Sequence, residues 1–119
     1  MKKLVIISTH GPDNAEKAIL PFVAATAAQS LGTEVNIISQ SNCVEIVSKG
    51  GAEKVQAEHF PNLKELLDLF IEQGGKLLVC SPCMKARCMT EEDLIDGATI
   101  VSAGTVIKEV DEADKVLVY

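Results

Sequence analysis

Short apolar runs alternate with amphipathic stretches along the whole chain. The runs cover residues 3–8, 34–39, 76–80, 98–102 and 115–119, and each has the length of a strand. The run Lys3–Ser8 has no polar alternation in its interior, which is typical of a strand covered on both faces. Strands that alternate with helices favour a parallel sheet. The pattern predicts an α/β fold, a three-layer α/β/α sandwich whose mostly parallel sheet of about five strands is doubly wound and flavodoxin-like, in one domain over residues 1–119.

The first predicted helix covers residues 14–31, where alanines and one phenylalanine recur at helical spacing. Asp13 is its predicted N-cap, with Glu16 completing a capping box, and Gly32 ends it. Pro21 lies inside this segment and predicts a kink or a later start, because proline removes a helical hydrogen bond.

The second predicted helix opens at Pro61-Asn62 and ends at Gly74-Gly75, and its apolar stripe consists of Leu63, Leu66, Leu67, Phe70 and Ile71. We expect shorter helices over 82–89, 91–95 and about 105–110, and a helical turn over 44–48. In open parallel sheets, sites form beyond the carboxyl ends of the strands. Here those ends are Thr9-His10, Gln40–Asn42, Cys80 and Ser102–Gly104.

Composition excludes several classes of function. The net charge is −6, which argues against nucleic-acid binding through phosphate neutralisation. Aromatic residues make up only 3% of the chain, which argues against binding through base stacking. No apolar run approaches the ~18 residues of a membrane span, and the run after Lys2-Lys3 is too short for a signal peptide. No Walker or GxGxxG pattern supports a nucleotide. We therefore expect a cytoplasmic protein with no cofactor and neither nucleic-acid nor membrane partners.

The chemistry of the chain is concentrated in three of its four cysteines, Cys80, Cys83 and Cys88. With Ser81 as N-cap and Pro82 as first residue, a helix would begin beside the first two thiols. The thiolate is the reactive form of cysteine. Half ionisation at neutral pH requires a pKa shift of roughly 1.5 units, or about 2 kcal/mol.

A helix N-terminus typically contributes about 0.3–1 kcal/mol, and up to ~2 kcal/mol when partly buried. A nearby cation would supply the remainder, and Lys85 and Arg87 are the candidates. Arg87 is the only arginine in the chain. We expect Cys80 and Cys83 to be catalytic together with Arg87, and Lys85 to bind.

Other interpretations of the cysteines remain open. Free cysteines are often core residues, which is the preferred interpretation of Cys43. A dithiol–disulfide role is compatible with the CxxC pair, although the pair comes too late in the chain for a thioredoxin. A zinc or iron–sulfur site would take its fourth ligand from Cys43, His10 or His59, but a second cysteine knuckle is missing.

Two further positions are candidate binding residues. His10 would act as a proton shuttle toward Cys80 if the first and third strands were neighbours, and otherwise is a solvated turn residue. Gly104, in the segment Ser102–Thr105 after the fourth strand, would present backbone N–H groups to an anion.

Several segments together resemble one family. Leu78-Val79-Cys80, Lys85-Ala86-Arg87 and Glu91-Glu92, with Lys49–Glu53 and Ser102–Gly104, are similar to the DsrE/DsrF-like family of small sulfur-relay proteins. The resemblance implies an α/β sandwich, an oligomer built on trimers or hexamers, and a persulfide on Cys80. Cys83 belongs to a C-x-P-C variant. Cys88 stands where many relatives have glycine, which makes it a candidate resolving thiol.

These observations predict a persulfide-carrying sulfur relay or sulfurtransferase protein in which Cys80 accepts sulfane sulfur and Cys83 is the auxiliary or resolving thiol. Its expected partners are sulfur donor and acceptor proteins or small persulfides, and further copies of the chain in a homo-oligomer. The alternatives are a non-catalytic oligomeric binding module, or a thiol-redox or metal-binding cysteine site.

Overall fold

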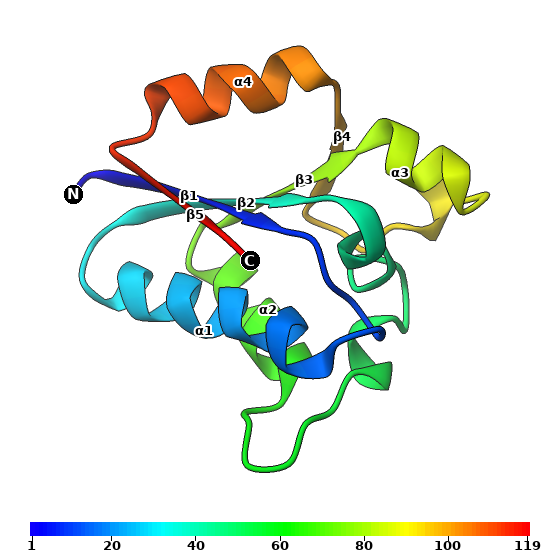
Figure 1. The fold of residues 1–119 in the computed structure, drawn as a ribbon. Helices are drawn as coiled ribbons and strands as arrows, with labels where there is room; N and C mark the ends of the chain where they lie inside the picture. Colours follow the sequence, from blue (N-terminus) through cyan, green and yellow to red (C-terminus); the bar gives the residue numbers. More distant parts are fainter.

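A computed structural model describes all of residues 1–119 and contains one parallel sheet. Its strands are β1 (Lys3–Ser8), β2 (Glu34–Ser39), β3 (Lys76–Cys80), β4 (Ala98–Val101) and β5 (Lys115–Val118). They lie in the order β4-β3-β2-β1-β5, and every neighbouring pair is parallel (Figure 1). The predicted parallel α/β sheet is confirmed.

Helices cover both faces of this sheet, as predicted. The helices α1 (Ala15–Ser30) and α2 (Leu63–Glu72) lie on one face, and α4 (Ala103–Glu112) lies alone on the other (Figure 1). The short α3 (Ser81–Ala86) follows the carboxyl end of β3. Three 3₁₀ turns complete the chain: η1 (Ser41–Glu45), η2 (Ala52–Lys54) and η3 (Glu91–Asp93). None of the helices is long and apolar enough to cross a membrane.

The strand order explains this distribution of helices. From β1 to β4 each strand is added on the same side of the previous one, so right-handed crossovers place α1 and α2 on one face. The last crossover returns past β1 to β5 and therefore carries α4 over the opposite face. The direction of winding reverses between β1 and β5, whereas flavodoxin reverses between its first and third strands.

Local capping differs from the prediction at the first helix. The N-cap of α1 is Asn14, whose side-chain oxygen accepts the Lys17 backbone N–H at 3.2 Å. Asp13 instead accepts the Gly11 backbone N–H at 2.8 Å, so its carboxylate is already engaged in the preceding turn. The helix runs through Pro21 without interruption.

The helix that follows Cys80 also begins earlier than predicted. Cys80 itself is the N-cap of α3 and Ser81 is the first helical residue, so Ser81 does not cap the helix. The helix is six residues long and ends at Ala86, with Arg87 as its C-cap, after which Cys88 adopts a left-handed conformation with φ of 56°. The predicted helix over 91–95 is only the turn η3, where Asp93 accepts the Thr90 backbone N–H at 2.7 Å.

The two faces of the sheet are packed unequally. The face under α1 and α2 holds a core of 22 buried residues, including Phe22 and Phe70 with ring centroids 5.9 Å apart. The face under α4 holds only four: Val5, Ile38, Leu78 and Val101. Because so little apolar surface is buried there, polar contacts contribute a larger share of the attachment of α4.

Glu109 supplies the polar contact between α4 and the sheet. Its carboxylate pairs with Lys3 Nζ at 2.8 Å and accepts the Asn36 side-chain N–H at 2.9 Å. Burial disfavours ionisation of Glu109, but the hydrogen bonds from Lys3 and Asn36 outweigh it and hold its pKa below the ordinary value. Ionised Glu109 therefore stabilises the folded chain.

We predict that Glu109→Gln lowers the free energy of unfolding at neutral pH by about 1–2 kcal/mol, because a charged hydrogen-bond partner is lost. Since the folded-state pKa is depressed, this stabilisation is present above the ordinary carboxyl pKa of 4.5 and is lost as the pH falls below it. Urea unfolding of both proteins across this range measures the difference. Asp111→Asn, at an exposed position of α4 that makes no ion pair, is the control. A difference that does not change with pH would contradict the role of the charge.

Candidate functional site

Two thiols meet at the carboxyl end of β3. Cys80 ends the strand, and Cys83 lies one turn into α3. The Cys83 thiol donates to the Cys80 sulfur at 2.8 Å, and both residues are free and partly exposed. A disulfide requires about 2.05 Å between the sulfurs, so a small movement would join them. The fold therefore places the two thiols of the CxxC pair in contact.

The surroundings of Cys80 do not produce the activation expected from a helix start. Burial is the largest influence and raises the pKa of Cys80, and the hydrogen bond between the Cys80 and Cys83 thiols, together with negative charge on Cys83, raises it further. The Cys83 backbone N–H and the charge of Arg87 lower the pKa, but by less. Pro82, as the second helical residue, has no N–H to add. The pKa of Cys80 is consequently above its ordinary value, because desolvation outweighs the helix terminus.

Cys83 receives a hydrogen bond from outside its own helix. The backbone N–H of Ser41, in the turn after β2, points to the Cys83 sulfur at 3.2 Å. Ser41 adopts a left-handed conformation with φ of 51°, which is uncommon for a residue with a side chain. This contact holds the Cys83 sulfur against the turn after β2.

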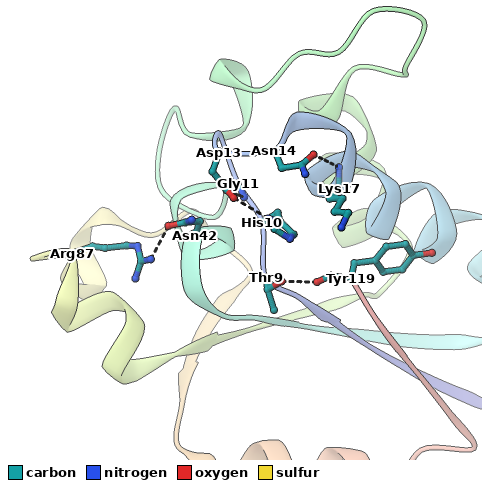
Figure 2. Close-up of polar contacts among 9 residues, drawn as sticks. All are labelled: Thr9, His10, Gly11, Asp13, Asn14, Lys17, Asn42, Arg87 and Tyr119. Carbon is teal, nitrogen blue, oxygen red and sulfur yellow. Dashed lines mark hydrogen bonds and ion pairs between the residues drawn. The ribbon is translucent and has the colours of Figure 1, made fainter.

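Arg87 lies at the other end of α3 and connects it to the same turn. Its guanidinium donates to the Cys83 carbonyl at 3.0 Å and to the Asn42 side-chain oxygen at 2.7 Å (Figure 2). Arg87 therefore lies beside the thiol pair, where it links α3 to the turn after β2 and contributes positive charge. Lys85 is exposed and makes no side-chain hydrogen bond or ion pair, so nothing in the fold links it to the thiols.

An apolar cavity of about 270 Å³ opens beside Cys80. It lies between the carboxyl ends of β3 and β4 and the first turns of α4, and its walls include Pro82, Val101, Val106 and Ile107. The polar lining residues, Gln40 and Ser102, carry no charge. Cys83 is not among the lining residues, so Cys80 is the sulfur of the pair that faces this cavity.

A second, larger cavity of about 450 Å³ adjoins the carboxyl end of α3. Arg87 and Cys88 line it, together with charged side chains of both signs from the segments after β2 and α3: Glu45, Lys49, Lys54, Glu92 and Asp93. Cys88 is exposed there, whereas Cys80 and Cys83 do not reach this cavity. Cys88 thus opens onto a polar surface that is separate from the apolar cavity beside Cys80.

Two predicted binding residues lie apart from Cys80. The condition for His10 is not met, because β2 separates β1 from β3. His10 Nδ1 instead pairs with the Asp13 carboxylate at 2.8 Å (Figure 2). The Gly11 N–H and then His10 hold the pKa of Asp13 below its ordinary value. Gly104 lies in the first turn of α4, between the lining residues Ala103 and Val106, but does not itself line the apolar cavity.

The fold gathers no metal ligands around the cysteine segment. No group of three or more His, Cys, Asp or Glu side chains has a metal-binding arrangement. Cys43 is completely buried, and burial raises its pKa, which confirms its interpretation as a core residue. The His59 side chain remains 88% exposed on a loop. The ligand set proposed from spacing is therefore not assembled.

Several site residues were not identified individually from the sequence. Ser41 reaches Cys83, and Asn42 reaches Arg87, only because β2 lies next to β3. Val106 and Ile107 line the cavity beside Cys80 only because α4 folds back over the sheet. The rule that sites form at strand ends did indicate the segment Gln40–Asn42. It carried no information about which groups would contact sulfur.

Solved structures share this fold. The ychN protein from E. coli covers 100% of both chains with a TM-score of 0.84 and 22% identity. A protein of unknown function from Methanobacterium thermoautotrophicum also covers 100% of both chains, with a TM-score of 0.78 and 15% identity. At these identities the likeness concerns the fold alone.

Closer relatives are known by sequence. An uncharacterized protein of Methanocaldococcus jannaschii is 37% identical over 117 residues, which cover 98% of this chain and 99% of the relative. An uncharacterized protein of Methanopyrus kandleri is 31% identical over 116 residues, covering 98% of this chain and 93% of the relative. The model of the DsrE/DsrF-like family matches residues 2–119. With its cysteine-bearing parallel sheet, this protein therefore belongs to the DsrE/DsrF-like family.

Proposed function

We propose that this protein is a sulfur carrier that holds sulfane sulfur as a persulfide on Cys80. The observation that carries the proposal is the thiol pair at the strand end, with Cys80 facing a cavity and Cys83 2.8 Å behind it. Sulfur relay is the activity that membership in the DsrE/DsrF-like family suggests. A nucleophile that faces a cavity, with a second thiol within reach, suits this chemistry.

Loading and delivery are two exchanges at the same sulfur. The Cys80 thiolate attacks the outer sulfur of a persulfide R–S–SH, giving Cys80–S–SH and the thiolate R–S⁻. An acceptor thiolate R′–S⁻ then attacks the outer sulfur of Cys80–S–SH, giving R′–S–SH and restoring the Cys80 thiolate. The Cys83 N–H and Arg87 favour the anionic sulfur that each exchange requires.

Cys83 opens a competing path. Its thiolate, whose sulfur lies against the Ser41 N–H, attacks the inner sulfur of Cys80–S–SH, forming the Cys80–Cys83 disulfide and releasing HS⁻. The two cysteine sulfurs are oxidised and the sulfane sulfur is reduced to sulfide. The lifetime of the carried sulfur therefore depends on how fast Cys83 attacks the persulfide.

We predict that incubation with inorganic polysulfide adds one sulfur atom to the wild-type chain, and that Cys80→Ser abolishes the addition at the CxxC pair. Intact mass and peptide mapping measure it. In Cys83→Ser the persulfide on Cys80 should persist about tenfold longer or more, with less sulfide released, because the neighbouring attacking thiol is gone. Cys88→Ser is the matched control and should behave as wild type. Loading that survives in Cys80→Ser at Cys83 would contradict the assignment of Cys80.

The pH dependence of alkylation tests the electrostatics of the pair. We predict that the Cys80 iodoacetamide profile has its midpoint above the ordinary thiol value, because burial and Cys83 raise the pKa. Cys83→Ser should move the midpoint to lower pH, and Arg87→Gln should move it higher, since Arg87 lowers the pKa. Peptide mapping separates Cys80 from the exposed Cys88. A Cys80 that iodoacetamide does not modify at any pH would favour the non-catalytic binding module.

We also infer a homo-oligomer formed through the β5 edge. All four residues of β5 are exposed, and Leu117 and Val118 keep 41% and 68% of their surface exposed. An unpaired apolar edge strand is a template for association. Val118→Lys should lower the molar mass measured by light scattering toward that of one chain, whereas Lys115→Arg, on the same strand, should not. A wild-type chain that is monomeric at all concentrations would overturn the inference.

A further inference from the structure

Cys80 is the only one of the four thiols that faces the apolar cavity. No lysine, arginine, aspartate or glutamate lines this cavity. Arg87, the cation whose charge acts on Cys80, donates instead to the Cys83 carbonyl and to Asn42 and lines the other cavity. A charged group placed beside Cys80 in this cavity would therefore lose water without gaining a counter-ion, which is unfavourable.

The size of the cavity limits its occupant further. Its volume of about 270 Å³ corresponds to roughly nine water molecules at ~30 Å³ each. That space suits a short aliphatic group and is too small for a folded segment. The rim is open, because Pro82 and Ala103 are exposed and Ile107 keeps 67% of its surface accessible. A small molecule can thus enter from solvent and place its sulfur against Cys80.

We propose that Cys80 exchanges sulfur with small organic persulfides whose carbon group is uncharged and aliphatic, and that the cavity between β4 and α4 holds this group. The inference rests on the proposed carrier function and specifies its substrate class. In the exchange, Cys80–S⁻ attacks the outer sulfur of R–S–SH, the sulfur–sulfur bond of the donor breaks, and R–S⁻ leaves with R in the cavity. Thiosulfate is a poor donor, because its leaving sulfite group would have to occupy the cavity, which offers no cation for it.

Alkyl methanethiosulfonates test the cavity independently of sulfane sulfur transfer. The reaction Cys80–S⁻ + CH₃SO₂–S–R → Cys80–S–S–R + CH₃SO₂⁻ leaves the group R beside the cavity. Rates are measured on the whole chain for R from methyl to butyl and for a sulfonatoethyl group, and are divided by the rates of free N-acetylcysteine. Peptide mass assigns each adduct, and Cys83→Ser prevents its loss through the second thiol.

We expect the normalised rate at Cys80 to rise about two- to fourfold for each added methylene, as apolar burial predicts. The sulfonatoethyl reagent should react at least tenfold more slowly than butyl. Cys88, which opens onto the polar cavity of the same chain, should show no chain-length dependence. Ile107→Ala should reduce the slope at Cys80, while Leu69→Ala, an exposed aliphatic residue on α2, should leave it unchanged. Both substitutions favour helix formation, so neither threatens folding.

A flat chain-length dependence at Cys80, or the same slope at Cys88, would overturn the aliphatic substrate class. The carrier function would stand if polysulfide still loaded Cys80. Conversely, a clear chain-length slope without any persulfide after polysulfide treatment would support the apolar cavity and remove the carrier function. The two experiments therefore separate the two proposals.

Discussion

The pairing of β2 with β3 is the constraint on which the site depends. The parallel register sets Ser39 beside Val79, so the residues that follow each strand emerge together at one edge of the sheet. As a result the Ser41 N–H reaches the Cys83 sulfur, and Arg87, at the end of α3, reaches the same turn. Backbone hydrogen bonds of the sheet thus hold the two thiols against a donor that is about forty residues away in the chain.

Opposing influences set the pKa of Cys80, and the start of α3 does not by itself lower it. Desolvation of Cys80 and the presence of a second thiol outweigh the Cys83 N–H and the Arg87 charge, and the pKa of Cys80 rises. A thiol with a raised pKa is more nucleophilic once ionised, although a smaller fraction is ionised at neutral pH. Under the proposed function, a raised pKa would limit the reaction of Cys80 with reagents in solution. Cys80 would then react mainly after a donor has entered the cavity.

The short α3 divides the surface into two chemically different regions. One side presents Cys80 to an uncharged cavity, and the carboxyl end presents Cys88 and Arg87 to a polar one. Cys88 holds a left-handed position where glycine is usual after a helix, so the chain accepts some strain to place a thiol there. The unequal packing of the sheet contributes as well, because the thinly covered face under α4 leaves room for the apolar cavity.

The sequence alone determined the parallel α/β class, the bounds of β1, β2 and β3, and the position of Cys80 at a strand end, because apolar periodicity and glycine or proline breaks are local signals. It also indicated the segment Gln40–Asn42, but not its contacts. Only the tertiary structure decided that β2 separates β1 from β3, which leaves His10 with Asp13, and that burial raises the pKa of Cys80. Strand order and desolvation arise from contacts between distant segments, and no local pattern of residues encodes them.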